Sequence, residues 1–127
     1  MQALSRFVLG NQSDFDYGAL IDRGRIAWAA MAVGACQTVL DYVIPYCNGR
    51  EAFGEPITNR QAVAFMIADI AIELEGMRLL CYRAASRAEQ GLPFAREAYL
   101  ARLQCAEIPV TTQHYETRSH LAFYRAQ

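Results

Sequence analysis

The chain has 127 residues, of which 54% are hydrophobic and 20% are charged. This length is enough for one domain with a hydrophobic core, and this composition is that of a globular chain rather than a disordered one. The formal net charge of −1 argues against a nucleic-acid-binding protein, which needs a basic face.

The N-terminal sequence MQALSRFVLGNQSD lacks the apolar segment and the cleavage site of a secretory signal. No apolar run approaches the ~20 residues that a bilayer requires, so we expect no membrane span. The four cysteines form no C-x-x-C pair and lie in apolar helical contexts: Cys36, Cys47, Cys81 and Cys105. This favours buried reduced thiols over disulfides or metal ligands. We therefore expect a chain of a reducing compartment, the cytoplasm or an organelle matrix.

Residues 1–16 are expected to be an irregular lead-in, and a long helix is predicted from about Tyr17 to Cys47. Residues 26–36 carry no charge on any face, which is typical of a helix that is buried all round. Pro45 is expected to kink this helix or end it nearby, because proline cannot donate a backbone hydrogen bond.

The connection from Asn48 to Gln61 reads NGREAFGEPITNRQ and is predicted to be a tight turn centred on residues 53–56. Thr58 and Gln61 have the spacing of a capping box at the start of the next helix. A rigid turn that carries an arginine and a lone aromatic residue is a suitable place to present a binding site.

A second helix is predicted from about Asn59 to Gln90, and a third from Pro93 or Phe94 to about Glu107, where Ile108-Pro109 should end it. Residues 108–127 form a polar tail with both histidines, and no strand pattern is evident. The expected fold class is all-α, with long antiparallel helices in an up-down bundle. Three such helices would leave apolar surface uncovered, for a partner subunit or a further domain.

No motif for a nucleophile, a phosphate-binding loop or a metal site is present. Trp28 is expected in the core, and Asp69 with Glu73 is expected on a solvated face that Arg60 or Arg78 balances. Two groups remain as candidate sites. Asp22 and Arg25 are either a surface ion pair or a clamp on a ligand hydroxyl or phosphate. Arg50, Phe53 and Gln61 surround the turn, where arginine can bind phosphate and phenylalanine can stack on a ring.

These same residues carry a resemblance to the C-terminal helical domain of acyl-CoA dehydrogenases. Its specific part is the pattern R-x-x-F-G-x-P-I followed by Q-A-V-x-F, and it extends over roughly residues 17–107. The resemblance implies a flavin-dependent oxidoreductase that removes hydrogens from the α and β carbons of an acyl-CoA thioester. It implies that Arg50, Phe53 and Gln61 contact FAD of a neighbouring subunit, that Asp22 and Arg25 face the acyl-CoA, and that the subunits form dimers or tetramers.

The sequence also departs from that family. A glycine-rich segment and a catalytic glutamate are expected after the third helix, and neither is recognisable in residues 108–127. The first-helix position that carries the base in some members is Gly24 here. We therefore expect an incomplete C-terminal domain with a divergent tail and no catalytic residue of its own. The alternative is a non-catalytic helical module that kept the fold and the self-association without the flavin chemistry.

Overall fold

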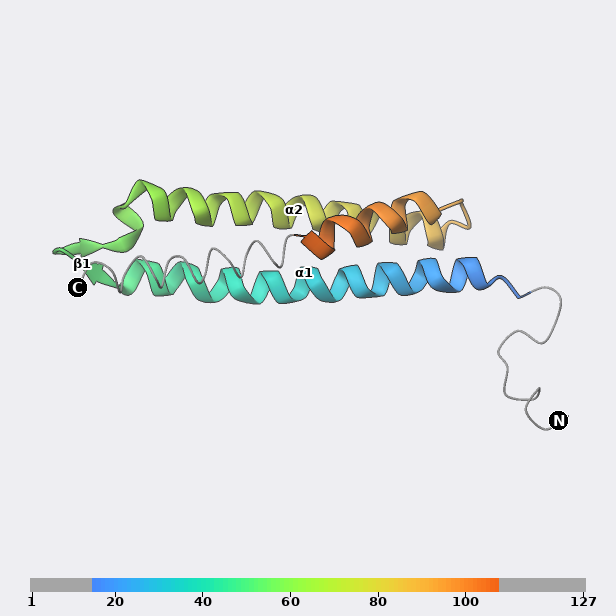
Figure 1. The fold of residues 1–127 in the computed structure, drawn as a ribbon, viewed down its shortest axis with the longest axis horizontal. Coiled ribbons are helices and arrows are strands. Elements are labelled where there is room, and N and C mark those ends of the chain that lie inside the picture. The colour runs from blue at the N-terminus through green and yellow to red at the C-terminus, as the bar shows by residue number, and fades with distance from the viewer. Residues whose placement is uncertain (1–14, 108–127) are drawn as a thin grey trace, which may run out of the picture.

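The structure, a computed structural model, describes residues 15–107. Two long helices, α1 (Tyr17–Gly49) and α2 (Gln61–Glu89), run antiparallel to each other (Figure 1). They are joined by strands β1 (Glu51–Ala52) and β2 (Glu55–Pro56) and the 3-10 turn η2 (Ile57–Asn59). Residues 95–107 form a third helix, which turns back along the α1–α2 pair (Figure 1). The predicted all-α class is confirmed.

The helix ends follow from local chemistry. Asp16 caps α1, since its carboxylate accepts a hydrogen bond from the Ala19 N–H at 3.0 Å. Gly91 ends α2 with a φ of +69°, and the next N–H, of Leu92, bonds back to the Arg87 carbonyl at 3.0 Å. This is the Schellman arrangement that glycine favours after a helix.

One prediction about the helix ends needs correction. The helix α1 ends at Gly49, two residues beyond the predicted end, and Pro45 lies inside it. The capping box is wrong: α2 begins at Gln61 with Arg60 as its cap, and no side chain caps it. Thr58 lies instead in η2, where the Arg60 N–H bonds to the Ile57 carbonyl at 3.1 Å. The 3-10 turn therefore displaces Thr58 from the position that a cap would need.

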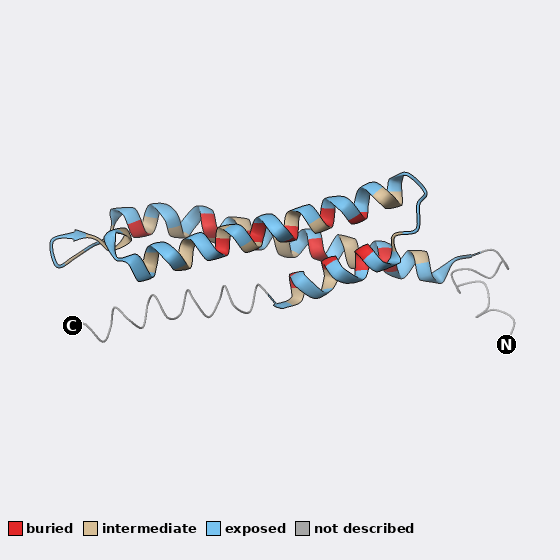
Figure 2. Cartoon of the chain, turned by 90° about the horizontal axis from the view of Figure 1, so that it is seen from above, coloured by how far each residue is buried: buried red, intermediate tan, exposed pale blue. Residues whose placement is uncertain are grey.

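The core is a narrow seam between the three helices. Its buried members are apolar side chains: Ala29, Cys36, Leu40, Ile70, Leu74, Met77, Cys81, Ala101 and Cys105. They recur at intervals of three or four residues on α2, so one stripe of each helix faces the seam (Figure 2). The remaining faces of α1 and α2 are largely exposed (Figure 2).

The sequence misjudged the surroundings of α1. The described residues do not enclose this helix: Met31 is 67% exposed, and Trp28 is 38% exposed rather than in the core. The Arg102 guanidinium of the third helix lies 3.5 Å from the centroid of the Trp28 ring. Hydrophobicity therefore indicated which surface must be covered, but not whether this chain covers it.

The length and composition of α1 bear on the membrane prediction. Among the described residues, α1 is the one helix whose length and apolar composition would suffice to cross a membrane. The expectation that no apolar run approaches the length of a membrane span is therefore not confirmed. Core helices of soluble proteins pass the same test, so the criterion by itself does not assign α1 to a bilayer.

Candidate functional site

The turn between α1 and α2 is a β-hairpin of two-residue strands. Glu51 pairs with Pro56 and Ala52 with Glu55, which leaves Phe53 and Gly54 as the two-residue loop. Both have positive φ, +60° and +83°, as a type I′ hairpin loop requires. Short strands were not predicted, because two-residue strands show no alternating pattern in the sequence.

Arg50 anchors the base of this hairpin. Its N–H closes α1 by bonding to the Tyr46 carbonyl at 3.0 Å, and its own carbonyl accepts from the Ile57 N–H at 2.9 Å. The guanidinium lies 5.9 Å from the centroid of the Tyr46 ring. The backbone of Arg50 is thus fixed from both sides of the connection, and its half-buried side chain starts from a rigid position.

Phe53 projects from the tip of the hairpin and is 76% exposed. The Arg60 guanidinium lies 4.8 Å from the centroid of its ring, a cation–π contact. A φ of +60° is unusual for a bulky residue and costs roughly 1–3 kcal/mol. An exposed aromatic ring held in a strained conformation is typical of a residue kept for binding rather than for folding.

This strain gives the first testable prediction. Phe53→Asn is expected to raise the free energy of unfolding by ~0.5–1 kcal/mol relative to Phe53→Ala, because asparagine tolerates positive φ and Asn-Gly suits this turn. Urea denaturation followed by circular dichroism measures the difference. Both variants remove the ring, so equal stabilities for the two would contradict the strain.

Gln61 completes the predicted group at this end of the molecule. It is the first residue of α2, and its side chain is exposed. The structure thus places Arg50, Phe53 and Gln61 on one short connection, from the end of α1 through the hairpin to the start of α2 (Figure 1).

Asp22 and Arg25 form the ion pair that their spacing predicted. The Arg25 guanidinium donates to the Asp22 carboxylate at 2.5 Å. Asp22 is buried, and the Arg25 guanidinium lies 5.8 Å from the centroid of the Tyr99 ring on the third helix. This pair lies near the start of α1, so a distance of roughly 38 Å along the helix, at 1.5 Å per residue, separates Arg25 from Arg50. The two candidate groups are not one site.

Glu97 and two arginines of α2 hold the third helix beside Asp22 and Arg25, and the sequence did not indicate these contacts. Glu97 is buried, and its carboxylate lies 3.8 Å from the Arg83 guanidinium and 3.6 Å from that of Arg87. Arg87 also donates to the Pro93 carbonyl at 2.9 Å. Because Glu97 lies 10 residues from Arg87 and 14 from Arg83, no helical spacing in the sequence could have revealed these ion pairs.

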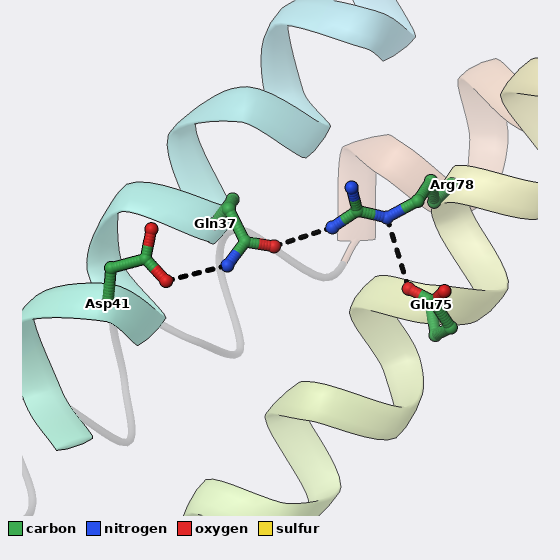
Figure 3. Close-up of polar contacts among 4 residues, drawn as sticks. All are labelled: Gln37, Asp41, Glu75 and Arg78. Atoms are coloured by element: carbon green, nitrogen blue, oxygen red, sulfur yellow. Dashed lines mark hydrogen bonds and ion pairs between the residues drawn. The ribbon is translucent and has the colours of Figure 1, made fainter.

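A second polar network links α1 and α2 halfway along their length (Figure 3). Arg78 donates to Gln37 at 2.5 Å and to Glu75 at 3.0 Å, and Gln37 donates to Asp41 at 2.7 Å. The expectation that Arg78 or Arg60 balances Asp69 and Glu73 is therefore wrong: Arg78 binds Glu75 and Gln37, and Arg60 covers Phe53. The Gln37–Asp41 and Glu75–Arg78 pairs could be predicted from their helical spacing. The hydrogen bond from Arg78 to Gln37 joins residues that are 41 positions apart in the sequence.

The predicted burial of the cysteines is confirmed: all four are buried, and none is paired in a disulfide. Cys36, Cys81 and Cys105 belong to the core cluster, one from each helix. Burial, followed by the neighbouring Cys81, raises the pKa of the Cys105 thiol from 9.0 to about 12. Burial also raises the pKa of Cys47 and Cys81. Among the described residues, no group of histidine, cysteine and acidic side chains could hold a metal ion.

The Cys105 pKa predicts how stability depends on pH. Below pH 9 the thiol keeps its proton in both states, so its contribution to stability is fully present. Between about pH 9 and 12 the unfolded thiol ionises while the folded one does not, and stability is expected to fall. Urea denaturation at about pH 8 and about pH 10.5, on either side of the unfolded pKa, measures the loss, which should be smaller in Cys105→Ala. An equal loss in both proteins would show that other groups cause it.

Three comparisons with known proteins bear on these residues. Residues 18–113 match the family model described as "Acyl-CoA dehydrogenase, C-terminal domain". The human mitochondrial short-chain specific acyl-CoA dehydrogenase is 42% identical over 94 residues, which are 74% of this chain and 23% of that protein. The structure resembles butyryl-CoA dehydrogenase from Megasphaera elsdenii with a TM-score of 0.69 and 32% identity, over 72% of this chain and 24% of that one. It resembles PigA with FAD and proline with a TM-score of 0.71 and 27% identity, over 72% and 24% of the two chains.

Proposed function

Because this chain belongs to the acyl-CoA dehydrogenase family and matches its C-terminal domain, we propose that it supplies FAD contacts, acyl-CoA contacts and subunit association to a flavin-dependent acyl-CoA dehydrogenase. The chain spans about a quarter of the length of the relatives it matches, 23% of the human protein and 24% of the bacterial structure. The reaction as a whole, α,β-dehydrogenation of acyl-CoA, is therefore proposed for the complete enzyme and not for these residues alone.

The hairpin suits one part of a flavin dinucleotide. The Arg50 guanidinium can donate two parallel hydrogen bonds to a pyrophosphate, and its charge offsets the charge of the phosphates. The exposed Phe53 ring offers a flat apolar surface, and the Gln61 amide can both donate and accept hydrogen bonds. The side-chain chemistry on this connection therefore fits FAD. When bound, the flavin would accept the hydride from the substrate.

Asp22 and Arg25 suit a separate contact with acyl-CoA. The Arg25 side chain is 39% exposed, so it can bind a polar group of the ligand while it remains paired with Asp22. Asp22 is buried and forms an ion pair with Arg25, whose guanidinium lies over the Tyr99 ring of the third helix. We assign these two residues to binding and orienting the substrate. No described residue is assigned as the base, since removal of the α proton needs a positioned carboxylate that the sequence match does not supply.

A second candidate function rests on the exposed apolar surface of α1 and α2. A helical module that has lost its flavin contacts would still need this surface for self-association. The human relative is named mitochondrial, and another relative comes from Bacillus subtilis. We propose that this chain lies in a cytoplasm or an organelle matrix.

The observation that carries the first function is the fixed hairpin with Arg50, Phe53 and Gln61 on one connection. The test is to incubate the purified chain with excess FAD, remove the free cofactor, and record the absorbance spectrum together with the sedimentation coefficient. A bound flavin spectrum that sediments with an oligomer is the expected result. A colourless oligomer would favour the association module. A chain joined to the remaining domains of the enzyme that still binds no flavin would overturn the FAD assignment.

A further inference from the structure

Two of the buried cysteines form a thiol pair between the third helix and α2. The Cys105 thiol donates a hydrogen bond to the Cys81 sulfur. Both residues belong to the core cluster, where the third helix packs along the α1–α2 pair (Figure 1). A disulfide requires the two sulfur atoms to lie ~2.05 Å apart. These two atoms are already in contact, so a small displacement of the helices suffices to bring them to that distance.

Cys36 of α1 is the third sulfur of the cluster and the competing partner. The pKa of the Cys105 thiol is raised first by burial, then by Cys81, and only after these by Cys36. A thiol has one proton, and that of Cys105 is directed to Cys81. The geometry therefore favours Cys81 as the partner of Cys105. Cys47 lies outside this cluster.

The docked third helix keeps this pair unreactive. The nucleophilic form of cysteine is the thiolate, and burial raises the pKa of the Cys105 thiol to about 12. The third helix spans residues 95–107, a length at which an isolated helix is marginal in water. Its Glu97 holds it to α2 by ion pairs with Arg83 and Arg87, whose side chains are 63% and 34% exposed. Undocking breaks these ion pairs and exposes both thiols to solvent.

We propose that Cys81 and Cys105 are a modification site, at which a low-molecular-weight disulfide such as glutathione disulfide oxidises the pair to an intramolecular disulfide when the third helix undocks. One protein thiolate attacks glutathione disulfide, which forms a mixed disulfide and releases one glutathione thiolate. The other protein thiolate attacks the protein sulfur of the mixed disulfide, which forms the Cys81–Cys105 bond and releases the second glutathione thiolate. The protein loses two electrons and two protons, and the two glutathione molecules gain them.

The disulfide fastens the third helix to α2. It closes a loop from Cys81 to Cys105, which restricts the unfolded chain and stabilises the folded one. The third helix also carries the Tyr99 ring, which lies 5.8 Å from the Arg25 guanidinium. Oxidation therefore fixes the helix that borders the Asp22–Arg25 pair. This consequence for acyl-CoA binding rests on the proposed function, whereas formation of the disulfide does not.

The first experiment maps the bond in the unmodified chain. The reduced chain is incubated with glutathione disulfide, its remaining thiols are alkylated, and it is analysed by mass spectrometry. We expect two of the four thiols to be protected from alkylation, no retained glutathione, and a digest in which the peptides of Cys81 and Cys105 are linked until dithiothreitol is added.

The urea midpoint measures the effect of the bond on stability. Oxidation should raise the midpoint of the unmodified chain, and dithiothreitol should reverse the rise. Cys36→Ala is the matched control, because it removes the third sulfur of the same cluster and should keep both the disulfide and the rise. Cys81→Ala should show no rise. Circular dichroism of the reduced variants shows that they fold.

The second experiment tests whether undocking of the third helix controls the reaction. Glu97→Gln is expected to speed the loss of thiols about tenfold, because it weakens both ion pairs to α2 and so favours the undocked state. The control is Asp69→Asn, which removes one negative charge from an exposed position of α2. Its rate should equal that of the unmodified chain.

Several results would overturn the proposal. Four alkylated thiols, under conditions that oxidise the urea-unfolded chain, would reject the site. A disulfide to Cys36, or glutathione retained without an internal bond, would reject the Cys81–Cys105 pair. Equal rates for Glu97→Gln and Asp69→Asn would reject undocking as the route. These readouts involve neither FAD nor acyl-CoA, so they are distinguishable from a failure of the proposed function.

Discussion

Replacing Leu74 by alanine is expected to lower the free energy of unfolding by about 3 kcal/mol. Leu74 is 2% exposed and lies in the seam between the three helices. Its neighbours include alanines and cysteines, which are too small to fill the cavity that the missing atoms would leave. Urea denaturation followed by circular dichroism measures the loss, which should appear as a lower midpoint.

The matched control is Leu20→Ala on α1. Leu20 is 46% exposed, so its truncation removes fewer contacts and is expected to cost less than ~1 kcal/mol. If the two leucine variants were equally stable, the seam described by the structure would not be the core of the folded chain.

Arg50→Ala is expected to weaken FAD binding by about 10- to 100-fold, since a hydrogen bond to a charged group contributes roughly 1.5–3 kcal/mol. Arg50→Lys should recover part of the affinity, because lysine keeps the charge but not the two-pronged geometry. Titration of FAD followed by the quenching of flavin fluorescence measures the dissociation constant.

The control for charge is Arg23→Ala. Arg23 is an exposed arginine near the start of α1, far from the hairpin, and its removal changes the net charge by the same amount. We expect its affinity for FAD to be unchanged. Equal losses in both variants would mean that the total charge of the chain, and not a contact at Arg50, controls binding.

The sequence and the structure agree where a feature depends on local spacing. Asp22 and Arg25 lie three residues apart on one helix, so their ion pair could be predicted without a fold. The start of α1 at Tyr17 and the stop signal at Gly91 were likewise readable. The capping box failed because η2 inserted a 3-10 turn, and its hydrogen bonds depend on how the hairpin closes.

The candidate site was predicted as a set of residues and not as a geometry. The sequence brought Arg50, Phe53 and Gln61 together because they lie within twelve residues. The positive φ of Phe53 and the Arg60 guanidinium on its ring came only from the structure. Three statements stay predictions: the domain boundaries, the roles of the five site residues, and the expectation that the chain has no catalytic residue of its own. The expected end of the third helix at Ile108-Pro109 and the polar tail lie outside the described residues.

The sequence by itself determined the all-α class, the long helices, the family and the chemistry of the hairpin residues, because periodicity, caps and short motifs act over a few residues. Only the tertiary structure decided which apolar faces this chain covers and which it leaves exposed. It also revealed the Gln37–Arg78 bond and the pairing of Glu97 with two arginines of α2. These contacts join different helices, so they exist only once the helices have packed.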